Sequence, residues 1–145
     1  MRWLKRLLKG PRMVDLHALC FSHHFHPLMA GRTSIKAVLP AVWSEASPIK
    51  SLPPYDEFPA DTDPYAALKK AGQVAEGCGA MQAYLDVLSG SVEARDIAKA
   101  GLLRYNYVDT LAMCLIVDYW TFRLDEQRGG AAATTRISKI SQPLK

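Results

Sequence analysis

Tyr105 and Asp109 are the two residues of this 145-residue chain whose types and spacing best suit a chemical role. They lie four positions apart in the stretch 102–113, so on a helix they stand on one face. That face continues through apolar residues, namely Ala112, Met113, Ile116 and Trp120. A carboxylate within an apolar stripe is costly unless a cation or hydrogen bonds satisfy it. The spacing therefore marks Asp109 as a candidate functional carboxylate.

Two structural interpretations of Asp109 compete with a functional one. Asp is a favoured N-cap residue, so Asp109 could begin a helix at Thr110. It could also be a solvated residue at the edge of the apolar stripe. A Tyr-x-x-x-Asp spacing is a loose pattern, and by itself it does not separate these interpretations.

A second group of reactive side chains lies near the start of the chain. Cys20, His23, His24 and His26 fall within seven residues, which suggests a zinc site. However, the sequence offers no second ligand cluster, and the adjacent His23 and His24 would point in different directions. We therefore favour a polar, aromatic helix end that leads into a loop.

The elements that must position these residues read as helices throughout. Apolar periodicity predicts helices over 14–21, over 80–88, from Ser91 to about Arg104, and from Thr110 to about Leu124. Ser91 is expected to be the N-cap of the third of these. The sequence shows no convincing β-strand and no internal repeat. In the helix over 80–88 the large apolar side chains are expected to point inward; they are Met81, Tyr84, Leu85 and Leu88. Gly77-Cys78-Gly79 is expected to break the helical pattern before it.

Two stretches contain prolines that argue against long helices. Ser34 is expected to cap a short helix over 35–39, which Pro40 stops. Five of the nine prolines then fall in residues 44–64, so this stretch is expected to be an extended loop. Such a long loop in a compact domain is either functional or draped over the surface.

The composition is that of an ordinary globular domain, with 49% hydrophobic and 22% charged residues. No apolar run is long enough for a membrane span. The three cysteines are widely spaced and never form Cys-x-x-Cys, which favours reduced thiols in a cytoplasmic protein. The net charge of +4 comes from the two ends, because residues 13–126 hold nine basic and fourteen acidic residues. Charge alone therefore does not predict a nucleic-acid-binding protein.

The two ends have their own patterns. Residues 1–9 place Trp3, Leu4, Leu7 and Leu8 on one helical face with basic residues opposite. This favours a surface helix that packs on the domain, with a membrane-surface helix as the alternative. Residues 127–145 contain a Gly-Gly-Ala-Ala-Ala-Thr-Thr run and only basic charges, and they read as a disordered basic tail.

Three segments, in order, resemble one known group of proteins. They are Arg12-Met-Val-Asp15-Leu16, the heptad Ser34-Ile35-Lys36-Ala37-Val38-Leu39-Pro40, and Leu103-Arg-Tyr105-Asn-Tyr-Val-Asp109-Thr110-Leu-Ala112-Met113. Together they look like the C-terminal half of an uncharacterised bacterial family with a DnaQ-like, RNase H-like 3′→5′ exonuclease domain. The similarity covers roughly residues 12–124, and the Gly79-Ala80-Met81-x-x-Tyr84 helix also fits it.

The resemblance implies that Tyr105 and Asp109 form the third exonuclease motif of the DEDD group, in its tyrosine-bearing form. In that group four carboxylates hold two divalent ions, magnesium or manganese, that hydrolyse phosphodiester bonds at DNA or RNA ends. Asp109 would be the last of the four carboxylates and a metal ligand. Tyr105 would help to orient the attacking water.

The sequence departs from this family in what it lacks. It contains no Asp-x-Glu, which forms the first motif of the family, and Asp15 matches a position after the second motif. One carboxylate does not hold two metal ions, so the metals are not expected to be held by this chain alone. The expected fold is mainly α as it stands: the helical C-terminal portion of an α/β RNase H-like exonuclease fold, its central sheet largely missing.

Two hypotheses about function follow. The first is a truncated DEDD-type exonuclease-like domain over residues 1–126, inactive alone, whose parent acts on nucleic acid ends. The second is a non-catalytic helical interaction module or remnant that binds a partner protein, such as the missing N-terminal half or a second copy of the chain. A third, weaker hypothesis is a small membrane-surface or nucleic-acid-binding protein with basic ends. A helical half without its sheet is expected to expose apolar surface and to oligomerise or fold marginally.

Overall fold

The computed structural model of the chain describes residues 14–129, and every regular element in that range is helical. The elements are α2 (Leu16–His23), η1 (Pro27–Met29), α3 (Ile35–Glu45), α4 (Ser47–Lys50), η2 (Tyr55–Glu57), α5 (Pro64–Lys70), α6 (Gly77–Ser89) and α7 (Val92–Gln127). The prediction of a mainly α chain is confirmed for these residues. The expected helix over 1–9 and nearly all of the expected tail from residue 127 lie outside them.

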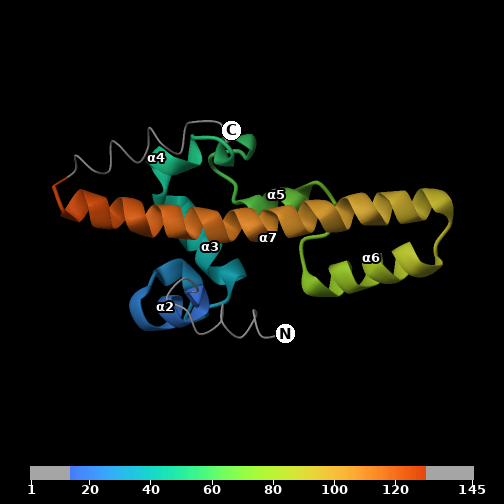
Figure 1. Cartoon of the computed structure of the whole chain (residues 1–145), viewed down its shortest axis with the longest axis horizontal. Coiled ribbons are helices and arrows are strands. Elements are labelled where there is room, and N and C mark those ends of the chain that lie inside the picture. Colours follow the sequence, from blue (N-terminus) through green and yellow to red (C-terminus); the bar gives the residue numbers. More distant parts are fainter. Residues whose placement is uncertain (1–13, 130–145) are drawn as a thin grey trace, which may run out of the picture.

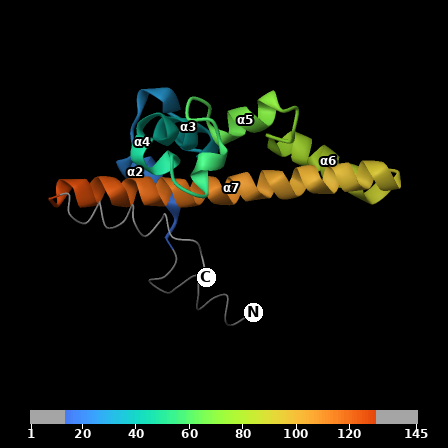
Figure 2. The same cartoon turned by 90° about the horizontal axis from the view of Figure 1, so that it is seen from above.

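The long helix α7 organises the molecule. Its 36 residues span about 54 Å at the usual rise per residue. Figure 1 shows α2, α3 and α4 gathered along its C-terminal half, while α6 runs back along its N-terminal half. Figure 2 shows that α3, α4 and α5 lie on one side of it. None of the helices within residues 14–129 combines the length and the apolarity that crossing a bilayer requires.

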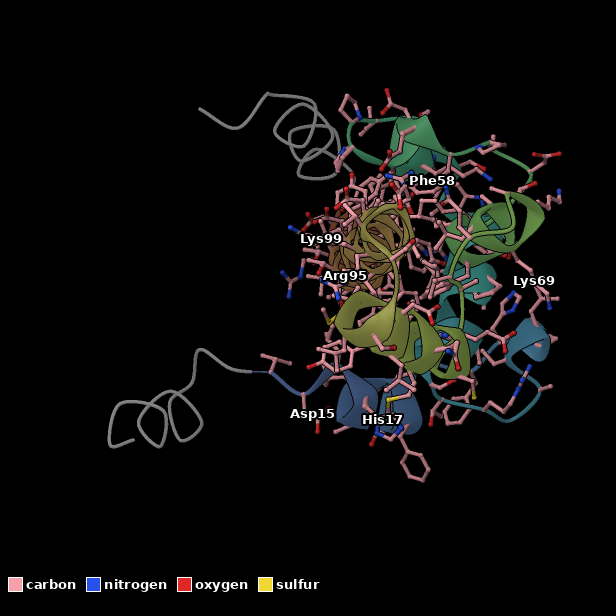
Figure 3. The ribbon with its side chains drawn as sticks, turned by 90° about the vertical axis from the view of Figure 1, so that its right-hand side faces the viewer. Asp15, His17, Phe58, Lys69, Arg95 and Lys99 are labelled. Carbon is pink, nitrogen blue, oxygen red and sulfur yellow. The ribbon has the colours of Figure 1, made fainter. Side chains whose placement is uncertain are left out.

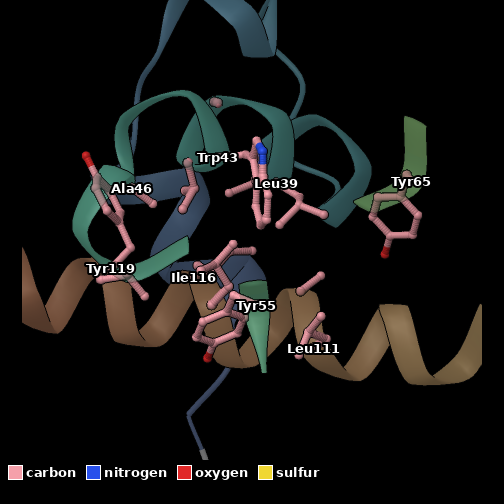
Figure 4. Close-up of a cluster of buried hydrophobic side chains, with 14 of the residues drawn as sticks. Leu39, Trp43, Ala46, Tyr55, Tyr65, Leu111, Ile116 and Tyr119 are labelled. Carbon is pink, nitrogen blue, oxygen red and sulfur yellow. The ribbon is translucent and has the colours of Figure 1, made fainter. Parts of the chain in front are cut away.

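The core forms where α7 meets the helices of the first half of the chain. The buried side chains of α7 recur every three or four positions along one face; they are Val108, Leu111, Ala112, Leu115, Ile116, Tyr119 and Phe122. Against this face pack buried side chains from α3 to η2, among them Leu39, Val42, Trp43, Ile49 and Tyr55. Figure 4 shows these two sets meeting above α7.

The helix α7 is continuous where two helices were expected. Ser91 is its N-cap, as predicted, because the Ser91 hydroxyl accepts a hydrogen bond from the Ala94 amide at 3.3 Å. The predicted break between Arg104 and Thr110 is wrong. No proline or glycine interrupts that stretch, and buried Val108 anchors it to the core. Asp109 is therefore inside a helix, and the interpretation of Asp109 as an N-cap is wrong.

Pro40 does not stop α3, which continues to Glu45. A proline inside a helix removes a hydrogen bond and costs roughly 3 kcal/mol. Directly after it, Ala41, Val42 and Trp43 are all buried in the core. Burying such side chains contributes about 1.5–3 kcal/mol for each large one, which offsets the cost of the proline.

The stretch 44–64 is not the extended loop that its prolines suggested. It contains α4 and η2, and it buries Ile49, Tyr55 and Phe58 in the core. Prolines are compatible with the first turn of a helix, and Pro48 lies in the first turn of α4. The segment is therefore part of the packed domain, and its apolar side chains attach it to α7.

The inward orientation predicted for the large side chains of α6 is wrong. Met81 is 64% exposed and Leu88 is 59% exposed, and Tyr84 and Leu85 are also exposed. The buried residue of α6 is Ala83, and Ala80 and Val87 are half-buried at helical spacing from it. The side of α6 that meets α7 therefore carries these smaller side chains, and the four large ones lie on the outer face. The Gly77-Cys78-Gly79 stretch is the first turn of α6 rather than a break.

Candidate functional site

Tyr105 and Asp109 lie on one face of α7, as the spacing predicted, and both are half-buried. Tyr105 packs against the edge of the core. This face contacts α5 through Asp109 and α3 through Tyr105. Asp109 therefore lies within the domain rather than at a helix end or in open solvent.

The Asp109 carboxylate accepts a hydrogen bond from the hydroxyl of Tyr65 on α5. Tyr65 is 7% exposed, and Figure 4 shows its hydroxyl pointing towards α7. Burial, followed by the hydrogen bond to Asp109, raises the pKa of Tyr65 well above its ordinary value. Tyr65 therefore remains a neutral donor and gives the carboxylate the partner that its apolar surroundings require.

The start of α5 fixes the position of Tyr65. Asp63 is the N-cap of α5, and its carboxylate accepts hydrogen bonds from the amides of Tyr65 and Ala66 at 3.0 and 3.1 Å. Pro64 at the first helical position is compatible with this geometry. At the other end Gly72, with φ +67°, ends the helix in the left-handed conformation that glycine adopts easily.

Lys36 of α3 completes the group. Its Nζ lies 5.0 Å from the ring centroid of Tyr105 and 5.3 Å from that of Tyr65. The same Nζ donates a hydrogen bond to the Ala75 carbonyl at 2.7 Å. We call Lys36, Tyr65, Tyr105 and Asp109 the α7 site. It combines one carboxylate, two phenols and one ammonium from three helices.

The α7 site does not provide the donors of a two-metal centre. Asp109 is its single carboxylate, and a hydroxyl already occupies one of its oxygens. Within residues 14–129, no three His, Cys, Asp or Glu side chains gather as metal ligands do. A magnesium or manganese pair would need carboxylates from beyond this range.

The histidines near the start of the chain have separate partners. The His24 ring packs on Trp120, and its Nδ1 accepts a hydrogen bond from Trp120 Nε1 at 3.3 Å. Burial lowers the pKa of His24, which favours the neutral ring. His26 Nε2 lies 3.3 Å from Glu45 Oε1, whereas His23 is exposed at the end of α2. These contacts agree with a helix end that leads into a loop.

Sequence reasoning missed two members of the α7 site. Tyr65 lies 44 positions before Asp109, and no periodicity links them. Lys36 lies in the heptad 34–40 of the resemblance, and this was the sequence signal that could have identified it. Asp15, in the first segment of the resemblance, lies elsewhere: it is the N-cap of α2, where its carboxylate accepts from the His17 and Ala18 amides.

Neither a protein-family model, nor a curated protein, nor a solved structure matches this chain.

Proposed function

We propose that the chain is the helical portion of a DEDD-type 3′→5′ exonuclease-like domain, cytoplasmic and inactive alone. In this proposal Asp109 is the last metal-binding carboxylate of the parent domain, and Tyr105 lies beside it to orient water. The parent activity is hydrolysis of phosphodiester bonds at DNA or RNA ends with magnesium or manganese. The remaining carboxylates come from a part of the domain beyond residues 14–129.

One observation supports this proposal above others. Two segments of the resemblance, far apart in the sequence, meet at the α7 site: Lys36 comes from one, and Tyr105 and Asp109 come from the other. Packing of apolar surface alone does not account for a carboxylate, a phenol and an ammonium at one place. Such gathering of polar groups at the edge of a core is typical of functional sites.

The test begins with the DNA immediately upstream of the Met1 codon. We expect it to continue the reading frame and to encode strands with Asp-x-Glu and a further Asp. The longer chain should then degrade single-stranded DNA from its 3′ end with manganese. Asp109→Ala should abolish this activity, whereas Asp96→Ala, at an exposed position of the same helix, should retain it.

Two results would overturn the proposal. One is a stop codon or unrelated sequence upstream of Met1. The other is a longer chain whose cleavage of DNA is unaffected by Asp109→Ala. The 145-residue chain itself should not cleave the same substrate, and cleavage by it that depends on Asp109 would show that the chain is not inactive alone.

A second candidate function is a non-catalytic module that binds a partner protein. The outer face of α6 favours it, because four large apolar side chains are exposed there in one helical stripe: Met81, Tyr84, Leu85 and Leu88. Leu85→Lys should weaken partner binding under this candidate. Under the nuclease proposal, the longer chain with Leu85→Lys should still cleave DNA, and this cleavage should still require Asp109.

A further inference from the structure

Lys36 brings an amine-bearing side chain to the α7 site. The faces of Tyr65 and Tyr105 both lie within 5.3 Å of its Nζ. An ammonium is attracted to the negative face of an aromatic ring, and here two rings hold one ammonium. The core holds both rings, since Tyr65 is buried and Tyr105 packs against the core cluster. The position of the charge is therefore set by the same helices that hold Asp109.

The Lys36 ammonium has hydrogen-bonding capacity left over. It can donate three hydrogen bonds, and among residues 14–129 its one acceptor is the Ala75 carbonyl. In the same range no carboxylate forms an ion pair with it. A half-buried cation without an acid partner, beside a predicted nuclease motif, is suited to an anionic ligand.

Other cations in this part of the molecule are differently placed. Lys69 lies 3.9 Å from Glu76, and Arg104 pairs with Glu57 at 3.0 Å. Figure 3 shows Arg95 and Lys99 on the side of the molecule opposite Lys69. Arg95 also donates to the Gly90 carbonyl at 2.9 Å. Lys36 is distinguished from these residues by its contact with Tyr105.

We propose that Lys36 binds a backbone phosphate of single-stranded nucleic acid and positions that strand beside Tyr105 and Asp109. The identity of the ligand rests on the proposed function. A lysine ammonium is a compact point charge that attracts phosphate oxygens, and a phosphate supplies the acceptors that its free donors lack. Because two rings already hold the side chain, little rotamer entropy is lost when the strand binds. Lys36 is a binding residue, and no covalent bond changes at it.

Lys50 provides a matched control within the chain. Its Nζ also lies over an aromatic ring, 5.8 Å from the Trp43 centroid, and it is also half-buried. It donates to two carbonyls, those of Trp43 at 3.3 Å and Ala60 at 2.8 Å. Lys50 therefore shares the aromatic contact and the carbonyl bonds of Lys36 but is not part of the α7 site.

The first experiment measures binding of a fluorescein-labelled 20-nucleotide oligothymidine to the full chain by anisotropy, in EDTA, over a range of potassium chloride concentrations. Each phosphate contact to a single strand contributes about 0.7 to the slope of log K against log salt. Lys36→Gln removes the charge but keeps a donor for Ala75, so its slope should be shallower by about 0.7. A tenfold drop in salt should then widen its deficit against the wild type by about fivefold. Lys50→Gln should retain the wild-type slope, and Lys36→Arg should restore it.

A second measurement uses the wild-type chain, so it does not depend on a variant folding. Lysines are acetylated with an amine-reactive ester, with and without the oligothymidine, and the modified sites are quantified by mass spectrometry. The oligonucleotide should slow modification of Lys36 several-fold and leave that of Lys50 unchanged. Equal protection of both lysines, no protection of Lys36, or no binding of the oligonucleotide would overturn the proposal.

The outcomes separate this inference from the proposed function. If the longer chain needs Asp109 for cleavage but Lys36→Gln binds DNA like the wild type, the inference fails and the function stands. If Lys36 sets the salt slope but cleavage is independent of Asp109, the function fails and Lys36 remains a nucleic-acid contact.

Discussion

Removing the hydroxyl of Tyr65 should destabilise the protein measurably, although the substitution changes one atom. Tyr65→Phe leaves the buried ring in place, so no cavity forms, and the loss is confined to the hydrogen bond to Asp109. A hydrogen bond to a charged group contributes about 1.5–3 kcal/mol. Asp109 is half-buried and regains part of its hydration, so we expect a loss of about 1.5–2 kcal/mol.

This free energy converts to a thermal shift that calorimetry resolves. Unfolding the 116 residues from 14 to 129 carries an entropy of about 0.24 kcal/mol per kelvin. The expected loss therefore lowers Tm by about 6–8 °C. Tyr84→Phe is the matched control, because Tyr84 is 53% exposed on α6, and it should change stability by less than about 0.5 kcal/mol.

A double-mutant cycle assigns the loss to the contact. Asp109→Asn keeps an oxygen that accepts from Tyr65 but removes the charge, so it should cost about half as much as Tyr65→Phe. In the Tyr65→Phe background the effect of Asp109→Asn should shrink, with a coupling of about 0.5 kcal/mol or more. A Tyr65→Phe protein as stable as Tyr84→Phe would refute the argument that this hydroxyl stabilises the half-buried carboxylate.

Three further outcomes are expected. First, burial and the hydrogen bond to Asp118 raise the pKa of Tyr55, and burial and the bond to Asp109 raise that of Tyr65. Above about pH 10 the folded chain therefore keeps protons that the unfolded chain loses, so the urea midpoint should fall as the pH rises from 10. A midpoint that stays constant to about pH 11.5 would contradict this. Leu39→Ala, at a fully buried position, should lower the free energy of unfolding by about 2–5 kcal/mol, while Leu103→Ala, 62% exposed, should change it by less than about 0.5; equal losses in denaturant titrations would contradict the core assignment. Exposed Cys78 should react with a thiol reagent in the native protein, whereas buried Cys20 should react only on unfolding, as peptide mapping of the labelled chain would reveal.

Local sequence pattern predicted those features that depend on neighbouring residues. The four-residue spacing placed Tyr105 and Asp109 on one helical face, and Ser91 was predicted as the N-cap of α7. Both follow from the geometry of a single helix, in which residues three or four positions apart are neighbours. The mainly α class followed in the same way, from helical periodicity and the lack of strand pattern.

Features that depend on tertiary packing were predicted wrongly or missed. Pro40 and the prolines of 44–64 signal helix ends and loops, but burial of the apolar residues between them outweighs that preference. The orientation of α6 was reversed, because an apolar stripe alone does not reveal which face meets the neighbouring helix. Tyr65 and Lys36 reach Asp109 and Tyr105 across long sequence separations, which a local pattern does not encode.

The contact between Tyr65 and Asp109 does not by itself distinguish a functional site from a structural one. The same pairing recurs along α7: Tyr55 donates to Asp118 at 2.7 Å, and Tyr119 donates to Glu45. Each pair joins α7 to a helix from the first half of the chain, so phenol–carboxylate bonds are a general means of attaching α7 in this fold. Satisfying Asp109 therefore requires no catalytic explanation.

What distinguishes the α7 site is that its cation, Lys36, lies over two aromatic rings without an acid partner among residues 14–129. Arg104 also lies over two rings, but it forms an ion pair with Glu57. The Lys36 ammonium does not neutralise a carboxylate of residues 14–129, and one carbonyl bond accounts for only part of its donor capacity. Lys50 shows the contacts expected of a lysine with a purely structural role, because it has two carbonyl acceptors and lies over one ring. The difference between these two lysines in nucleic acid binding therefore tests the site more directly than any substitution of Tyr65, whose effect on stability is expected under both interpretations.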